Sequence, residues 1–222
     1  MRVSWGEPCR VRGMEASLLM RRRALRLVAV LGFAGRRARA AGDPVGAVAT
    51  QRGSVSVIRG AAILALAPGD PVFTDDIVRT AADARLLIVC RDGLRIAIGA
   101  GTEVALRAYL ADSASGSLQA AFGLLRGIIR LIGRQNAARQ GIEVDTRTAL
   151  ASVRSTEWLV EATGKGTGVL AITGEVEVRG LAGGVVLLHP GEGTDVAPGS
   201  PPRSPARWGE ARRTDAVART TL

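Results

Sequence analysis

Aromatic side chains are scarce in this 222-residue sequence: phenylalanine, tryptophan and tyrosine together make up 3% of it. Valine, isoleucine, leucine and alanine must therefore fill its core, and such residues suit a narrow β-sandwich or β-roll better than a large cavity. Histidine occurs once, as His189 before a Pro-Gly turn. No nucleophile or metal-ligand pattern accompanies it, so enzyme activity has little support and no cofactor is expected.

Long apolar runs are also absent. The apolar run nearest the N-terminus, residues 27–35, is far shorter than the roughly 20 residues that cross a bilayer. It follows the basic segment Met20–Arg26 and precedes the small-x-small site Ala38-Arg39-Ala40. This order is typical of a secretory signal peptide.

We therefore predict a signal peptide over residues 1–40, with Met14 and Met20 as alternative starts. The mature chain would be periplasmic and would have no membrane span. The paired arginines before Ala24 resemble a loose twin-arginine signal, so both export routes are open. A basic, weakly helical N-terminal tail is the alternative interpretation.

Net positive charge is concentrated ahead of the predicted cleavage site. The whole chain has 30 basic and 20 acidic side chains, a net charge of +10. Residues 1–40 hold ten arginines and two glutamates, so residues 41–222 retain 20 basic and 18 acidic side chains, a net of +2. Because most of the basic excess belongs to a segment that export removes, nucleic acid is not an expected partner.

Cysteine occurs twice, as Cys9 and Cys90. Cys9 precedes the predicted signal, so the mature chain would retain Cys90 alone, without an intramolecular disulfide or a zinc site. Cys90 ends the apolar run Leu86–Cys90, which indicates a small buried core residue rather than a reactive thiol.

Short apolar segments separated by glycine turns fill the rest of the chain. Three of them lie within Val153–Gly193, and none has the length or the period of a helix. The clearest hairpin signal is Asp92-Gly93, which separates two alternating segments, residues 84–90 and 94–98.

One stretch, Leu118–Gly133, is ambiguous because arginine recurs every four residues in its second half. As a helix it would be basic and amphipathic, suited to a membrane surface or a partner groove. Its three glycines and three isoleucines instead favour a strand over residues 124–132, with glycines at bends.

Two segments of the chain share one pattern. Gly53–Gly60 and Gly174–Gly180 both alternate valine with polar residues between glycines. Each is followed by an apolar linker and then by Leu-x-Pro-Gly-acid, at Leu66–Asp70 and Leu188–Glu192. The repetition predicts a domain built twice from one small β unit, with chance similarity between glycine- and valine-rich strands as the alternative.

These patterns together predict an all-β fold. We expect a curved β-sandwich or β-roll of short antiparallel strands that contains the two echoed units. Residues 197–207 are rich in proline and indicate a linker. Residues 208–219 are expected to form a short C-terminal helix or a disordered tail, with Trp208 able to dock onto the β domain.

The order of the pieces resembles the FecR domain family, whose members are periplasmic all-β modules named after a regulator of iron transport. A G-x-V-x-V strand and P-G-D are followed by Ala84–Gly93, by the block Thr148–Trp158, and by a second G-x-V-x-V strand before P-G-E-G. The resemblance covers residues 45–199. The family usually has glycine at the position of Ser155 and often proline at that of Arg147. The resemblance implies a regulatory or interaction module.

Four charged residues are candidate partner contacts. Arg134 and Arg139, with the loop between them, suit an anionic partner. Arg154 and Glu157 flank a hydroxyl residue just before an indole and are candidates for a recognition corner. The alternative is architectural: Arg154 and Glu157 would bridge a turn while Trp158 fills the core.

The predicted organisation is a signal peptide over residues 1–40, a FecR-like β domain over 41–199, and a Pro/Arg-rich linker and tail over 200–222. The first functional hypothesis is non-catalytic protein binding in envelope signalling. Its partner would be a transporter or an anti-sigma-type regulator.

Two further hypotheses belong to other classes of protein. A module that binds peptidoglycan or carbohydrate would need exposed aromatic rings, which only Tyr109, Trp158 or Trp208 could supply. A hydrolase, the third hypothesis, would need His189 close to an acid and a nucleophile.

Overall fold

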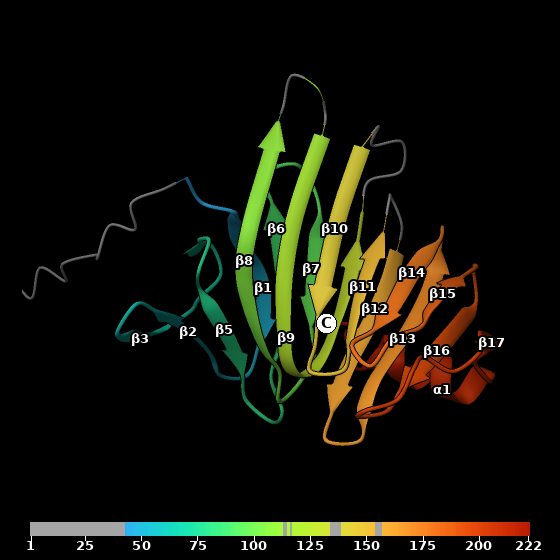
Figure 1. Ribbon diagram of the computed structural model, residues 1–222. Coiled ribbons are helices and arrows are strands. Elements are labelled where there is room, and N and C mark those ends of the chain that lie inside the picture. The colour runs from blue at the N-terminus through green and yellow to red at the C-terminus, as the bar shows by residue number, and fades with distance from the viewer. Residues whose placement is uncertain (1–42, 113–114, 116, 134–138, 154–156) are drawn as a thin grey trace, which may run out of the picture. The chain divides into compact units, whose positions relative to one another are not determined.

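Strands dominate the computed structural model, which describes residues 43–112, 115, 117–133, 139–153 and 157–222 (Figure 1). Within these residues it contains seventeen strands and one helix, all in the unit Ala40–Leu222. The strands form one continuous hydrogen-bonded sheet that is folded into two layers, A and B. The predicted signal peptide lies outside the described residues.

Each layer is a row of neighbouring strands, and β9 belongs to both. Layer A contains, in spatial order, β4 (Pro71–Val72), β1 (Gly46–Arg52), β6 (Arg85–Cys90), β7 (Arg95–Ile98), the second half of β9 (Ser117–Ile132), β12 (Glu157–Thr163), β13 (Gly166–Thr173), β16 (Glu192–Val196) and β17 (Ala206–Arg207). Layer B contains β3 (Ala62–Ala65), β2 (Val55–Arg59), β5 (Ile77–Thr80), β8 (Glu103–Asp112), the first half of β9, β10 (Arg139–Asp145), β11 (Ala149–Val153), β14 (Val176–Gly180) and β15 (Val185–Leu188).

The passage of β9 between the layers depends on Gly127. Its φ of 93° lies in the left-handed region, where glycine has no steric cost. The backbone of β9 also approaches Thr102 closely there, since a Cβ on Gly127 would lie 2.3 Å from the Thr102 Oγ1 atom. The same Thr102 hydroxyl accepts a hydrogen bond from the Ile128 N–H at 3.0 Å. The strand predicted over residues 124–132 is thus confirmed, with a glycine at its bend, and it extends back to Ser117.

Every pairing among the described strands is antiparallel except that of β9 with β10. Arg139 of β10 lies beside Ser117, the first residue of β9, and the two strands then run in the same direction. Because β9 folds back on itself at Gly127, its end returns toward the level at which it began. A following strand can therefore enter beside Ser117, a long-range arrangement that local sequence patterns do not encode.

Aliphatic side chains from both layers fill the space between them. The inward residues alternate with outward ones along each strand, as in Val55 and Val57 of β2 or Leu86 and Ile88 of β6. Trp158, with no exposed surface, is among the largest of these buried side chains. The predicted sandwich with an aliphatic interior is confirmed.

The two echoed segments form the same structure. In each unit a strand of layer A is followed by a hairpin of layer B and by a return strand of layer A: β1, β2, β3 and β4 in the first, β13, β14, β15 and β16 in the second.

The Leu-x-Pro-Gly-acid turns of the two units also match bond for bond. The Asp70 carboxylate accepts from the Ala67 N–H at 2.8 Å, and the Glu192 carboxylate accepts from the His189 N–H at 2.9 Å. The N–H groups of Gly69 and Gly191 donate to carbonyl groups in the first strand of their own unit, at 2.8 Å in both cases. The sequence echo is therefore a structural repeat.

A short helix, α1 (Glu210–Ala218), covers part of the outer face of layer A. Trp208 just before it is 7% exposed and packs with Ala216 against three outward side chains of layer A: Ile128, Leu159 and Leu170. Nine residues are too few for a stable isolated helix, so these contacts hold α1 in place. No helix in the described part of the chain is long and apolar enough to cross a bilayer.

Candidate protein-interaction surfaces

One of the four predicted contact residues has a described side chain. Glu157, at the start of β12, accepts hydrogen bonds from the Arg130 guanidinium of β9, and both side chains are about four-fifths buried. Arg134 and Arg154 lie outside the described residues. Arg139 begins β10, where only its backbone is described. Of the four, the structure thus places one side chain, and it gives Glu157 an ion pair within the domain.

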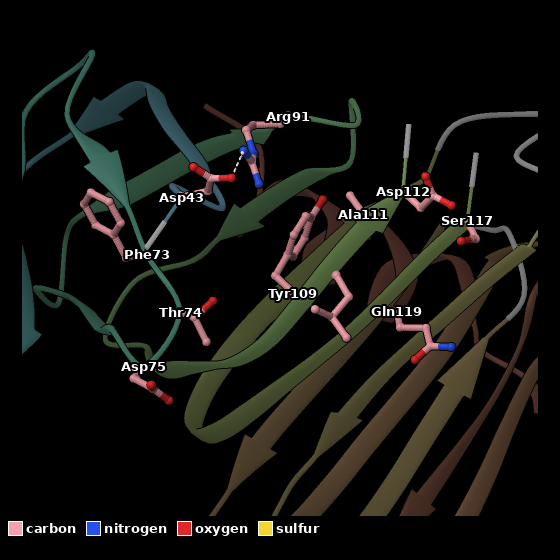
Figure 2. A pocket seen from close by; sticks show the side chains of 11 residues that line it. Asp43, Phe73, Thr74, Asp75, Arg91, Tyr109, Ala111, Asp112, Ser117 and Gln119 are labelled. Atoms are coloured by element: carbon pink, nitrogen blue, oxygen red, sulfur yellow. Dashed lines mark ion pairs between the residues drawn. The ribbon is translucent and has the colours of Figure 1, made fainter. Parts of the chain in front are cut away.

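A pocket of about 860 Å³ opens beside the hairpin of β8 and β9 (Figure 2). Five segments contribute to it, which explains why no local motif predicts it. They are the chain entry at Asp43, the loop Phe73–Asp75, the turn residue Arg91, the end of β8 from Tyr109 to Asp112, and Ser117 and Gln119 of β9.

One wall of the pocket is held by a buried ion pair. Asp76 has no exposed surface, and its carboxylate accepts two bonds from the Arg59 guanidinium, at 2.7 and 2.8 Å. It also accepts from the Phe73 N–H at 2.9 Å, while Arg59 stacks 4.5 Å from the Phe73 ring centroid. The hydrogen bond with Asp76 raises the pKa of Arg59. The loop on that wall is thus fixed before any ligand arrives.

The floor of the pocket is a buried tyrosine. Tyr109 is 9% exposed, and its hydroxyl donates to the Asp92 carboxylate in the β6–β7 turn. Burial raises the pKa of Tyr109, with the neighbouring Cys90 and Asp92 adding to the effect. Burial also raises the pKa of Cys90 to about 12, so the thiol stays protonated, as expected of a core residue.

The rim of the pocket is acidic. Asp43, Asp75 and Asp112 line it together with a single cation, Arg91. Figure 2 shows Asp43 and Arg91 joined as an ion pair, at 3.3 Å between the Asp43 Oδ2 and Arg91 Nη1 atoms. Three carboxylates and one guanidinium give the rim a charge of about −2, opposite in sign to residues 41–222 as a whole.

Beside this pocket, half of β8 has a strand on one side only among the described residues. β8 pairs with β5 only through Glu103–Ala105, and two further bonds join the backbone of Leu106 to that of Asp75 and Asp76. From Arg107 to Asp112, β9 is the only described strand that pairs with β8. Four residues of this segment, Tyr109 to Asp112, line the pocket.

The outer strands of layer B form a second type of surface. β3 and β15 each pair with one described strand only, β2 and β14 respectively. Neither strand contains a charged residue, and both expose aliphatic side chains: Ile63 is 69%, Val185 54% and Leu187 46% exposed. Because β3 and β15 occupy equivalent places in the two repeated units, the chain presents the same kind of edge twice.

The C-terminal segment closes the outer face of layer A. Arg212 stacks 3.5 Å from the Trp208 ring centroid and forms two bonds with the Asp195 carboxylate of β16, at 2.5 and 2.9 Å. Arg219 donates to Glu161 of β12 at 2.9 Å. This face is therefore occupied by the chain itself.

The residues required by the other two hypotheses are dispersed. A carbohydrate-binding module would need an exposed ring, but Trp158 is fully buried and Trp208 packs against layer A. Of the three aromatic residues considered, this leaves Tyr109 at the pocket floor. His189 lies at an exposed turn, where its Nδ1 atom is 3.3 Å from the Glu175 carboxylate, and no hydroxyl or thiol bonded to it appears in the described part of the chain. The described residues also hold no cluster of three or more potential metal ligands.

Sequence reasoning missed the pocket and the free half of β8. Asp75, Asp92 and Asp112 have the appearance of ordinary turn acids when they are taken one at a time. Only the register of β8 with β5 and β9 shows that Asp75 and Asp112 share the rim of the pocket. The uncharged segments Ala62–Ala65 and Val185–Leu188 were visible signals, because most edge strands contain a charge or a proline.

Comparison with known proteins gives one family match. Residues 76–177, from the start of β5 into β14, match the family model described as FecR protein. No curated protein matches the chain. Two crystal structures of a "putative anti-sigma factor" from Parabacteroides distasonis ATCC 8503, at 1.65 and 2.50 Å resolution, are similar at 19% identity and a TM-score of 0.49. The similarity covers 64% of this chain and 64% and 63% of those chains, less than two thirds of their length. By its family match, this chain carries a FecR domain over residues 76–177.

Proposed function

We propose that this chain is an exported, non-catalytic FecR-type module that regulates envelope signalling by binding another protein. The FecR domain over residues 76–177 supports a regulatory role. The family resemblance suggests a transporter or an anti-sigma-type regulator as the partner.

The observation that carries the proposal is the pair of uncharged edge strands, β3 and β15. Soluble proteins usually protect such edges with lysine, proline or a bulge, because an open edge recruits a further strand. Here Ile63, Val185 and Leu187 are exposed on strands whose outer edge pairs with no other described strand. Covering an apolar side chain contributes roughly 25 cal/mol per Å² buried, and added main-chain hydrogen bonds give orientation. A partner that adds a strand obtains both.

The proposal is tested by site-specific crosslinking in the native host. A photoreactive amino acid replaces Leu187 on β15 in the full chain, and a second variant places it at Arg213 on α1, which is also exposed. We expect one envelope protein to crosslink through position 187 and not through 213. The addition of Val185→Lys, on the same strand, to the probe strain should reduce the adduct. Equal adducts from both positions would contradict the proposal.

Export is tested separately. Cell fractionation should place the chain in the periplasm, and its intact mass should correspond to residues 41–222. Replacement of Arg21, Arg22 and Arg23 by glutamine should retain the chain in the cytoplasm, because the basic segment orients a signal peptide. An uncleaved cytoplasmic chain in the unsubstituted strain would overturn the proposed location.

A further inference from the structure

We infer that the pocket beside β8 binds an extended, basic segment of a partner protein, which adds as a strand to residues Arg107–Asp112. The inference depends on the proposed function only in that the ligand is part of a protein. It concerns a different surface from β3 and β15.

The first step is the free edge of β8. The pairing on the β5 side of β8 ends at Leu106. The Leu106 carbonyl accepts from the Asp75 N–H at 2.7 Å, and the Leu106 N–H donates to the Asp76 carbonyl at 2.9 Å. Asp75, with a φ of 69°, turns the chain away at this point. After the register shift at Arg107, residues Ala108 to Asp112 pair with β9 alone among the described strands, so the backbone groups on their other edge can accept a strand about 4.8 Å away.

The second step is the space beside that edge. Between the end of β8 and the loop Phe73–Asp75 lies the pocket of about 860 Å³, within the range of roughly 300 to 1,000 Å³ typical of ligand sites. Its far wall is fixed by the buried Asp76–Arg59 pair, so a ligand need not organise it. Leu110 is 68% exposed on the pocket lining and provides an apolar contact for a side-chain stem.

The third step is charge. The rim places Asp43, Asp75 and Asp112 around one arginine on a domain that is otherwise slightly basic. A lysine or arginine of the added strand would extend its aliphatic stem along Leu110 and place its cation among the carboxylates. An acidic segment would be repelled there. A sugar would find little aromatic surface, since Tyr109 is 9% exposed and Arg59 covers one face of the Phe73 ring.

The test uses the full chain and two fluorescein-labelled heptapeptides, SVKVKVS and SVEVEVS, in anisotropy titrations at low salt. Two exposed carboxylate pairs are worth roughly 1 to 1.4 kcal/mol together, so we expect the lysine peptide to bind about tenfold more tightly. The double variant Asp75→Asn, Asp112→Asn should lose most of that preference. The control Glu177→Gln, which removes an exposed acid on β14, should keep it.

Two further measurements use the unsubstituted chain, so a variant that fails to fold cannot affect their outcome. A lysine peptide with N-methylated backbone should bind at least several-fold more weakly, because it cannot form the strand pairing. Hydrogen exchange should show new protection in residues 107–112 with the lysine peptide. Equal binding of the two peptides, equal binding of the N-methylated form, or protection in β3 or β15 instead would overturn the inference. Partner crosslinking through position 187 would still succeed in that case, so failure here leaves the proposed function standing.

Discussion

At the scale of single residues, Gly127 determines whether one strand can serve both layers. Its φ of 93° costs an L-residue about 1 to 2 kcal/mol, and an added Cβ would lie 2.5 Å from the Thr102 Cα atom, a backbone atom that cannot swing aside. We expect Gly127→Ala to lower the free energy of unfolding by about 3 kcal/mol, with urea denaturation as the measurement.

Gly141 on β10 is the matched control for this substitution. Its φ is not positive, and the nearest atom to an added Cβ is 4.0 Å away, on the Gln119 side chain. Gly141→Ala should therefore leave the urea midpoint unchanged or raise it slightly. If both variants shift the midpoint equally, the bend at Gly127 does not have the role assigned to it.

Cys90 makes stability depend on alkaline pH. Burial raises the pKa of its thiol from an ordinary value of 9.0 to about 12, so the folded state retains a proton that the unfolded state releases. The stability that this proton contributes is complete below pH 9 and is lost as the pH rises toward 12. Between pH 9 and 11 the wild type should lose about 2 kcal/mol more than Cys90→Ala.

This pH prediction is checked by urea unfolding of both chains at pH 8, 9, 10 and 11. The Cys90→Ala variant starts less stable, so the slope against pH is the informative quantity rather than the absolute value. Tyr109→Phe should flatten the curve further, because the pKa of Tyr109 is raised by the same burial. Parallel curves for wild type and Cys90→Ala would contradict the prediction.

Which charged side chains meet was the least predictable feature at this scale. The sequence suggested a bridge from Glu157 to Arg154, which lies outside the described residues, and gave no sign of the pairing with Arg130, 27 residues away, that the structure shows. That pairing depends on the antiparallel register of β9 with β12, which places Glu157 opposite Ile132 and Leu159 opposite Arg130. Nothing local to either strand specifies the register. Burial of Cys90 and Trp158, by contrast, follows directly from residue type and was predicted.

At the scale of elements, the docked C-terminal segment is held mainly by one indole. Trp208 packs over Gly193, where an added Cβ would lie 2.3 Å from the Trp208 Nε1 atom, and it is 7% exposed. Truncation of a buried tryptophan to alanine typically costs 3 to 5 kcal/mol. We expect Trp208→Ala to destabilise the domain by about 3 kcal/mol and to expose Ile128, Leu159 and Leu170, with increased binding of a hydrophobic dye.

Arg213→Ala is the control for this element, since Arg213 is exposed on α1 and its side chain forms no ion pair among the described residues. Its effect should stay within about 0.5 kcal/mol. Thermal unfolding of both variants, with dye fluorescence at 25 °C, gives the comparison. If Trp208→Ala neither binds dye nor loses stability, α1 is not a structural cover of layer A.

Elements whose signal is local were predicted with nearly correct bounds. Alternation and Asp92-Gly93 located the hairpin of β6 and β7, and the repeated Leu-x-Pro-Gly-acid turn located the two units. The parallel pairing of β9 with β10 was not predicted, because it follows from a bend that brings distant residues together. The pocket beside β8 was missed for the same reason: its residues come from five separate segments.

At the scale of the whole domain, the two repeated units share one interior. Buried residues of the first unit, such as Val57, and of the second, such as Val178, belong to one continuous hydrophobic cluster. β9 contributes strand pairings to both layers, and hydrogen bonds from β9 reach β7, β8, β10 and β12. Both units are connected to β9 through the strands that lie between, and their interiors are continuous with its buried side chains.

We therefore expect the described domain to unfold as one cooperative unit despite its internal repeat. Native-state hydrogen exchange followed by mass spectrometry should give the same free energy of opening for the best-protected amides of β6, in the first half, and β13, in the second. Both should match the free energy of unfolding obtained from urea, because opening of either strand requires loss of the shared core. The Gly127→Ala variant should lower both values together, since it acts on the strand that joins the layers. A gap of more than about 1 kcal/mol between β6 and β13 in the wild type would show that the two halves of the domain are energetically separate, and β9 would then be a link between two independently opening halves.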